Sequence, residues 1–422
     1  MAQNKYKKSI KLWSESAKVI VPGSSSVAKG PNLFTYGAYP IYLTTAKGAT
    51  VKDADGNKYI DFQSAFGSII LGNRYKAVDE AIAKQLKRGI LFSLLSSLQI
   101  DFAKLVTGMI PGAEEIRIFK TGADAVTGAI RIARAYTKRD KIVSCHFHGW
   151  HDWSYVYEKQ NFGIPKNVTE NVLTFTYNDL ESLEKLFTKF PNEIAAVVME
   201  AVNIEPPGTD YLQKVRSLAH RHGALLIFDE VVTGFRFARG GAQEFFKATA
   251  DVSCFSKALA NGMPLAMVTG SRKIFEETKE VITSSTFSEE TLSLAAAIAT
   301  LKEMRDKNVV EHIWELGNMF KSGYNSLAKK YEINSECVGY APRLQLNFGD
   351  WGPNKRLKLK AYFLQETAER GILFGNVIFI NYSHTERQIK KSLKVCDAVF
   401  AKLFKMKNRA ITIKGNKTEE LW

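Results

Sequence analysis

The sequence predicts an α/β fold in which helices cover a mainly parallel β-sheet, together with a smaller α+β domain. Between about residues 75 and 305, short apolar runs alternate with helix-like segments. Continuous apolar strands separated by helices are typical of parallel sheets that are buried on both faces. The 422 residues exceed the usual size of one domain, and 45% of them are hydrophobic, so two packed lobes are expected.

The elements follow one another in a regular order. We expect strands at 115–119, 141–145, 194–199, 224–228, 252–255 and 265–269, and helices at 123–136, 182–190 and 211–220. Near the N-terminus, two polar–apolar runs flank Asp55-Gly56, which predicts a β-hairpin over 50–61. The predicted domains are an N-terminal segment of the small lobe (1–60), a large domain (61–305) and a C-terminal small domain (306–422).

Composition narrows the class of protein. The formal net charge is +15, but the lysines are scattered, which is typical of a solvated surface; attraction of anionic substrates is the alternative. No nucleic-acid-binding motif, no CxxC pair, no N-terminal apolar signal segment and no apolar run of 18 residues occurs. We therefore expect no nucleic-acid partner, no membrane span and a cytoplasmic location.

Small residues follow the strand predicted at 115–119. Thr121-Gly122-Ala123 stands where the next helix opens. Small side chains let the backbone approach an anion, and the N–H groups and dipole of a helix N-terminus attract a phosphate. The alternative is an ordinary strand-to-helix turn with Thr121 as the N-cap.

An acid and a lysine follow two later strands. Asp229 comes directly after 224–228, and a carboxylate at a buried strand end needs a partner such as a protonated pyridine nitrogen. Its alternative is a helix cap or a structural ion pair. Lys257 follows 252–255, where burial would make its amine a nucleophile toward carbonyls. The alternative for this lysine is simple surface exposure.

Three histidines and an aspartate gather in the segment 146–152. They favour a metal site, and hence a metal-dependent hydrolase, as an alternative function. Their order differs from the hydrolase pattern HxHxDH, and the other histidines lie in no supporting motif, so we predict no metal. The other interpretation is that Phe147 stacks on a planar cofactor with His148 beside it.

The order of these features is more specific than any one of them. A phosphate turn, an aromatic stacker, an acid and a lysine follow successive strands of one parallel sheet. A pyridoxal 5'-phosphate (PLP) site needs the same four parts: an anion cradle, a ring clamp, a pyridinium partner and an amine that forms a Schiff base. Neither a P-loop nor a GxGxxG fingerprint is present to favour a nucleotide instead.

Five segments resemble class-III aminotransferases, in particular glutamate-1-semialdehyde aminomutase and aminotransferases associated with surface polysaccharides. The resemblance covers about residues 20–305 well and the C-terminal lobe loosely. The segments are Gly56-Asn57-Lys58-Tyr59-Ile60-Asp61-Phe62, Thr121-Gly122-Ala123-Asp124-Ala125, Phe147-His148-Gly149, Phe228-Asp229-Glu230-Val231-Val232-Thr233-Gly234-Phe235-Arg236 and Lys257-Ala258-Leu259-Ala260-Asn261-Gly262-Met263-Pro264.

The resemblance implies PLP as the cofactor, the PLP fold-type I, and a homodimer with its sites at the interface. It makes Lys257 the Schiff-base lysine and proton shuttle, and Asp229 the partner of the pyridinium. The other implied contacts are Phe147 and Val231 on the two ring faces, Thr121, Gly122 and Ala123 at the phosphate, Thr286 at the neighbouring subunit's phosphate, and His148, Glu200 and Asn203 lining the site.

Departures from the aminomutase bear on the substrate. Val27-Ala28-Lys29 stands where the aminomutase pattern has an arginine, Ser64-Ala65-Phe66-Gly67 replaces Gly-Ser-Trp-Gly, and the stretch Ser288-Glu289-Glu290-Thr291-Leu292 stands where the aminomutase pattern has Gly-Asn-Pro. We expect transamination from L-glutamate to a small phosphorylated ketone, such as dihydroxyacetone phosphate, or to a sugar carbonyl, for polysaccharide biosynthesis. The aminomutase is the alternative. Arg343 is a candidate anion anchor or, equally, a structural arginine.

Overall fold

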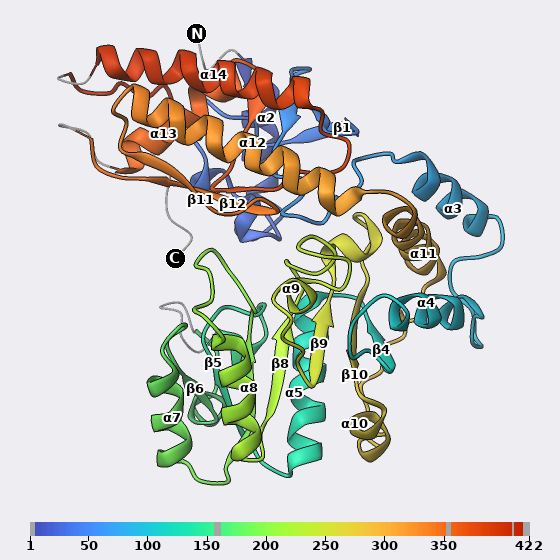
Figure 1. The fold of residues 1–422 in the computed structure, drawn as a ribbon. Helices are drawn as coiled ribbons and strands as arrows, with labels where there is room; N and C mark the ends of the chain where they lie inside the picture. The colour runs from blue at the N-terminus through green and yellow to red at the C-terminus, as the bar shows by residue number, and fades with distance from the viewer. Residues whose placement is uncertain (1–4, 156–161, 352–355, 407–408, 417–422) are drawn as a thin grey trace. The chain divides into compact units, whose positions relative to one another are not determined.

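The computed structural model describes residues 5–155, 162–351, 356–406 and 409–416 (Figure 1). The chain forms two compact units. The terminal unit comprises Met1–Tyr75 and Glu311–Trp422, and the central unit comprises Lys76–Val310. The domain limits near residues 60 and 305 stay a proposal from the sequence.

The central unit is built on a seven-stranded sheet with the order β4-β10-β9-β8-β7-β5-β6. The pairs β9–β8, β8–β7, β7–β5 and β5–β6 are parallel, which confirms the mainly parallel sheet. The strands are β4 (Glu115–Phe119), β5 (Lys141–Ser144), β6 (Val172–Thr174), β7 (Ile194–Met199), β8 (Leu225–Asp229), β9 (Val252–Phe255) and β10 (Ala266–Gly270).

Strand β10 is the exception, because it pairs antiparallel with both β9 and β4. Only residues 256–265 connect β9 to β10. A parallel crossover needs a dozen residues or more, so this short connection returns the chain in the opposite direction. Because β10 is antiparallel to both of its neighbours, β9 and β4, strand β4 runs in the same direction as the parallel strands.

Both faces of the central sheet are covered. Every residue of β7, β8, β9 and β10 is buried, although alternate side chains of a strand point to opposite faces. Helix α5 (Gly122–Thr137) packs along β4, β7, β8, β9 and β10, and α8 (Tyr211–Arg221) packs on β8 (Figure 1). The continuous apolar runs of the sequence are therefore the core of this unit.

The remaining helices of the central unit surround this core. Helix α11 packs against α3, α4 and the 3₁₀ turn η4 that follows β9. These elements are α3 (Lys76–Leu86), α4 (Leu98–Thr107), η3 (Asp152–Ser154), α6 (Lys166–Glu170), α7 (Leu180–Lys189), α9 (Ala242–Phe245), η4 (Lys257–Ala260), α10 (Arg272–Glu277) and α11 (Thr291–Asp306).

The terminal unit contains two small sheets and four longer helices. One sheet has the order β1-β2-β3-β13, and its antiparallel β2–β3 pair confirms the predicted hairpin. The helices and strands of the terminal unit are α2 (Lys7–Ser16), η1 (Val27–Lys29), η2 (Pro31–Leu33), β1 (Leu43–Lys47), β2 (Thr50–Asp53), β3 (Lys58–Asp61), α12 (Val309–Lys330), β11 (Ser335–Tyr340), β12 (Arg343–Phe348), α13 (Arg356–Glu369), β13 (Ile372–Leu373), β14 (Val377–Ile378) and α14 (Glu386–Lys405).

None of the helices in the described ranges is both long enough and apolar enough to cross a membrane.

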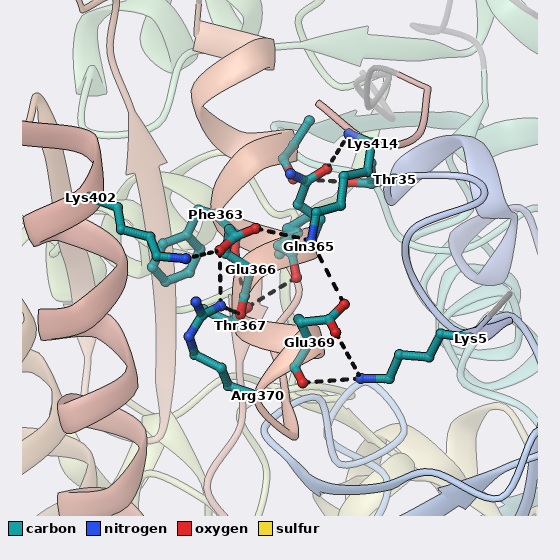
Figure 2. A network of polar contacts seen from close by, with 12 residues as sticks. Lys5, Thr35, Phe363, Gln365, Glu366, Thr367, Glu369, Arg370, Lys402 and Lys414 are labelled. Atoms are coloured by element: carbon teal, nitrogen blue, oxygen red, sulfur yellow. Dashed lines mark hydrogen bonds and ion pairs between the residues drawn. The ribbon is translucent and has the colours of Figure 1, made fainter. Parts of the chain in front are cut away.

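A polar network joins helix α13 to the end of the chain (Figure 2). The Glu366 side chain is only 5% exposed and accepts hydrogen bonds from Arg370 (3.0 Å) and Lys402 (3.1 Å), while Lys414 lies 3.5 Å away. Burial raises the pKa of the Glu366 carboxyl, but Lys402, Arg370 and Lys414 lower it more, so the net pKa lies below its usual value. The carboxylate therefore stabilises the terminal unit in its ionised form.

Glu366→Gln should lower the free energy of unfolding by about 2 kcal/mol at pH 7, because the charged hydrogen bonds are lost. A carboxylate whose pKa is lowered by folding stabilises the protein fully only above its pKa in the unfolded chain, which is about 4.3 for glutamate. This stabilisation is lost as the pH falls through the pKa of the folded state. The deficit should therefore narrow below about pH 4.3. Urea unfolding across this range measures it, with Glu15→Gln, in an exposed pair with Lys11, as the control. A deficit independent of pH would contradict the assignment.

Candidate active site

The predicted site residues of the central unit gather at one edge of the sheet. Strands β4, β5, β7, β8 and β9 run in the same direction, so their carboxyl ends lie at the same edge. Ligands of open α/β sheets bind at this edge. Asp229 ends β8, and Thr121, Phe147, Glu200 and Lys257 follow the ends of the other four strands.

A buried aspartate–histidine pair lies at the centre of this edge. Asp229 is the last residue of β8 and is 6% exposed, and His148 is 4% exposed. His148 Nδ1 donates a hydrogen bond of 2.7 Å to Asp229 Oδ2, and the backbone N–H of Val231 donates to Asp229 Oδ1 at 2.9 Å. His148 Nε2 is buried without a hydrogen-bond partner among the described residues.

The surroundings of Asp229 keep its carboxyl ionised. Burial raises the pKa of Asp229, but the hydrogen bond and charge of His148, the Val231 N–H and the charge of Lys257 together lower it further. The net pKa lies below the usual value for an aspartate. The Asp229 carboxylate thus carries a buried negative charge at the strand end, which can pair with a cationic group.

The predicted phosphate turn lies against two neighbouring segments. Thr121 is the N-cap of α5, and it forms a capping box with Asp124. A Cβ at Gly122 would lie 2.8 Å from the Val231 side chain, and a Cβ at Gly149 would lie 2.6 Å from the Cβ of Ala123. The first N–H groups of a helix have no intrahelical partner, so the turn keeps donors for an anion while serving as a cap.

Lys257 occupies a strained position. It begins η4 directly after Ser256, with φ of +47°, and Asn261 at the end of the same turn has φ of +45°. Left-handed backbone is unusual for residues other than glycine and is often found at functional sites. The charge of Lys257 lowers the pKa of Asp229, which places the ammonium within the electrostatic reach of that carboxylate.

The segment 146–152 does not gather its histidines into one site. His146 contacts the Cys145 thiol, His148 binds Asp229, and His151 binds Thr127 Oγ1 at 2.8 Å. The described residues contain no group of three His, Cys, Asp or Glu side chains that could hold a metal. Phe147 is 41% exposed, and its ring meets that of Tyr155 edge-on at 5.4 Å.

Glu200 and Asn203 form a pair after β7. Asn203 Nδ2 donates to Glu200 Oε2 at 2.6 Å, and the Glu200 residue is 4% exposed. Burial, and secondly the charge of Glu200, raise the pKa of the Cys145 thiol well above its usual value. The cysteine at this edge is therefore a neutral thiol rather than a nucleophile.

Two predicted residues lie outside this cluster. Thr286 is exposed in the central unit and lines an open hollow of about 1060 Å³, whose walls include Leu91, Phe92 and Leu94. Arg343 begins β12 in the terminal unit.

Sequence reasoning missed an ion pair next to the phosphate turn. Lys120 Nζ lies 3.2 Å from Glu290 Oε2, and the side chains are 15% and 13% exposed. The available signal was a lysine directly before the Thr121 turn. Its partner stands 170 residues later in the chain, and nothing in the sequence alone pairs the two.

Comparisons with known proteins agree on one family. The model of the family "Aminotransferase class-III" matches residues 35–381. The 3-aminobutyryl-CoA aminotransferase of Cloacimonas acidaminovorans (strain Evry) is 33% identical over 419 residues, which are 95% of this chain and 99% of that protein. The glutamate-1-semialdehyde 2,1-aminomutase of Archaeoglobus fulgidus is 32% identical over 418 residues, covering 92% of this chain and 98% of the relative.

A solved structure has the same fold. The PLP internal aldimine form of the FumI protein of Sphingopyxis sp. MTA144 superposes with a TM-score of 0.90 and 25% identity, covering 95% of this chain and 97% of that one. The likeness confirms the predicted PLP fold-type I.

Gly149→Ala should separate the 147–149 loop from the phosphate turn, because its Cβ would collide with Ala123 at a φ of +112°. We expect a loss of about 3 kcal/mol in the free energy of unfolding, from backbone strain and overpacking together. Gly112→Ala is the matched control, since Gly112 has φ of +76° with nothing within 4 Å of its Cβ position, and it should cost only about 1 kcal/mol. Equal losses in urea unfolding would contradict the close contact.

Proposed function

The chain belongs to the class-III aminotransferases, whose cofactor is PLP, and we propose that the cluster around Asp229 and Lys257 is its active site. The observation that carries this proposal is a buried Asp229 at the end of β8, which accepts hydrogen bonds from His148 and the Val231 N–H, with Lys257 at the start of the turn that follows the neighbouring strand β9. The proposed reaction moves an amino group from L-glutamate to a small phosphorylated ketone, such as dihydroxyacetone phosphate, or to a sugar carbonyl.

The residues present fit the cofactor. The N–H groups of Gly122 and Ala123, with Thr121, would bind the phosphate at the N-terminus of α5. Phe147 and Val231 would contact the two faces of the ring, Asp229 would pair with its nitrogen, and the amine of Lys257 would hold it covalently. A side chain larger than hydrogen at Gly122 would meet Val231, so this glycine keeps the cradle and the ring contact compatible.

Bound PLP supplies an electron sink for the negative charge left when a carbon beside an amino group loses its proton. The chain's own residues prepare that step. His148 keeps Asp229 ionised, and Asp229 in turn favours a protonated pyridine ring. Once the donor's amine has displaced it from the cofactor, the freed Lys257 Nζ would take the proton from the donor carbon that bears the amino group and would return it, as a general acid, to the cofactor carbon.

We further propose that two copies of the chain form a dimer around the hollow that Thr286 lines. Exposed apolar side chains line it, including Phe92, Leu94, Leu95 and Ile282. An exposed apolar patch of this kind favours a protein interface. In the dimer, Thr286 would reach the phosphate of the partner's cofactor.

The substrate proposal depends on departures from the aminomutase pattern. Ser288-Glu289-Glu290 and Ser64-Ala65-Phe66-Gly67 differ from it, which favours transfer between two molecules over isomerisation of one. The polysaccharide role is proposed from the same resemblance, the cytoplasmic location from the widely spaced cysteines, and Arg343 as an anion anchor from the chemistry of its guanidinium. Glutamate-1-semialdehyde aminomutase is the second candidate, favoured by the 32% identity to such an enzyme over nearly the whole chain.

A half-reaction screen tests the substrate. L-Glutamate should bleach the visible band of the PLP-loaded protein, and dihydroxyacetone phosphate or a keto-sugar should restore it. Conversion of glutamate-1-semialdehyde without a second substrate would make the protein an aminomutase. The screen also includes 3-aminobutyryl-CoA, because a relative carries that name.

His148→Phe should raise the pKa of Asp229, because the hydrogen bond and charge of His148 no longer offset the effect of burial. Protonation of Asp229 would begin at a higher pH, so the acid limb of the kcat/KM profile should move upward. At pH 7 we expect kcat/KM to fall about tenfold, the effect of one charge-assisted hydrogen bond. His220→Phe removes a comparable contact, with Asp251 at 2.9 Å, and should leave the limb in place. An unshifted limb in His148→Phe would refute the role of the pair.

A further inference from the structure

One connection of the central unit carries Thr286 and is anchored before it. The 278–290 segment joins α10 to α11. Arg117 of β4 donates hydrogen bonds to the carbonyl oxygens of Val281 (2.7 Å) and Thr278 (3.0 Å), and to Thr283 Oγ1 (3.1 Å). The stretch that follows, residues 284–287, is exposed.

Glu290 anchors the same segment at its other end. It is the N-cap of α11: Oε1 accepts from the N–H of Leu292 at 2.5 Å, and Oε2 accepts from Ser293 Oγ at 2.5 Å. The same Oε2 lies 3.2 Å from Lys120 Nζ. The next residue, Thr291, is fully buried and bonds to the backbone of Gly89 and Ile90. The position of this end is therefore fixed by several contacts.

Lys120 links this anchor to the phosphate turn. It stands between the last residue of β4 and Thr121, the N-cap of α5. The Lys120–Glu290 pair thus connects the N-termini of α5 and α11. One of these termini is the proposed phosphate cradle, and the other ends the segment that carries Thr286.

The charges of this pair bear on an incoming phosphate. Glu290 is ionised at neutral pH, because its hydrogen bonds and Lys120 lower its pKa although burial raises it. An uncompensated carboxylate near a dianionic phosphate would oppose binding, whereas one paired with a lysine would not. Because Lys120 offsets its charge, the Glu290 carboxylate can cap α11 close to the proposed phosphate cradle without opposing the binding of a phosphate.

We propose that Lys120 and Glu290 are positioning residues that fix the 278–290 segment to the phosphate turn, so that Thr286 and the turn are both placed for cofactor phosphates. The inference rests on the proposed PLP site and on the proposed role of Thr286. Glu290 belongs to the stretch Ser288-Glu289-Glu290-Thr291-Leu292, which stands where the aminomutase pattern has Gly-Asn-Pro.

The test compares Lys120→Met, Lys120→Arg and the double variant Lys120→Met/Glu290→Gln with the wild type. Gln at 290 keeps an oxygen for the helix cap but removes the charge. PLP is titrated into each cofactor-free protein, and hydrogen exchange of amides 282–289 is followed with and without PLP. Lys141→Met is the matched control, because Lys141 forms a similar pair with Glu193, at 3.0 Å, at the start of β5.

Lys120→Met should raise the dissociation constant of PLP about tenfold, because it leaves the partly buried Glu290 carboxylate without its cationic partner. It should also speed exchange of residues 282–289 in the cofactor-free protein. Lys120→Arg should bind PLP as the wild type does, and the double variant should recover most of the affinity lost in Lys120→Met. Lys141→Met should change neither readout.

Two results would overturn the inference. One is wild-type PLP affinity and wild-type exchange in Lys120→Met; the other is an equal loss in the double and single variants. A wild-type protein that binds no PLP would instead refute the proposed site. The exchange of 282–289 is measured without cofactor, so it reports on the anchoring of the segment in either case.

Discussion

The proposed active site depends on one buried charge, the carboxylate of Asp229. A carboxylate at 6% exposure is unfavourable unless donors surround it, and His148 and the Val231 N–H supply them. The arrangement is possible only because the strands end at a common edge. There the loop after β5 reaches past β7, so that His148 binds Asp229 at the end of β8, and Lys257 follows β9, which neighbours β8.

Close packing around the proposed phosphate turn also holds the segments of the site in position. The turn has no room on either side: Val231 lies against Gly122, and Gly149 lies against Ala123. The three segments that would contact the phosphate, the ring face and the ring nitrogen therefore position one another without the cofactor. Such preorganisation reduces the conformational cost of binding.

Much of this could be predicted from the sequence, because fully buried parallel strands are continuous apolar runs and because the site residues follow them. The limits of β4, β7 and β9 were predicted to the residue, and Asp229 and Lys257 stand out by their places after such runs. The reversal of β10 was not predicted, since it follows from a short connection rather than from a hydrophobic pattern. The Lys120–Glu290 and His148–Asp229 pairs escape sequence reasoning because only the fold brings residues so far apart in the chain together.

The central claim is that Lys257 holds the cofactor covalently beside the Asp229 charge. Borohydride reduction of the PLP-loaded wild-type protein, followed by peptide mapping, tests it most directly. The expected result is one pyridoxyl adduct, on Lys257, and none in Lys257→Ala. An adduct confined to another lysine, or no adduct at all in the wild type, would contradict it.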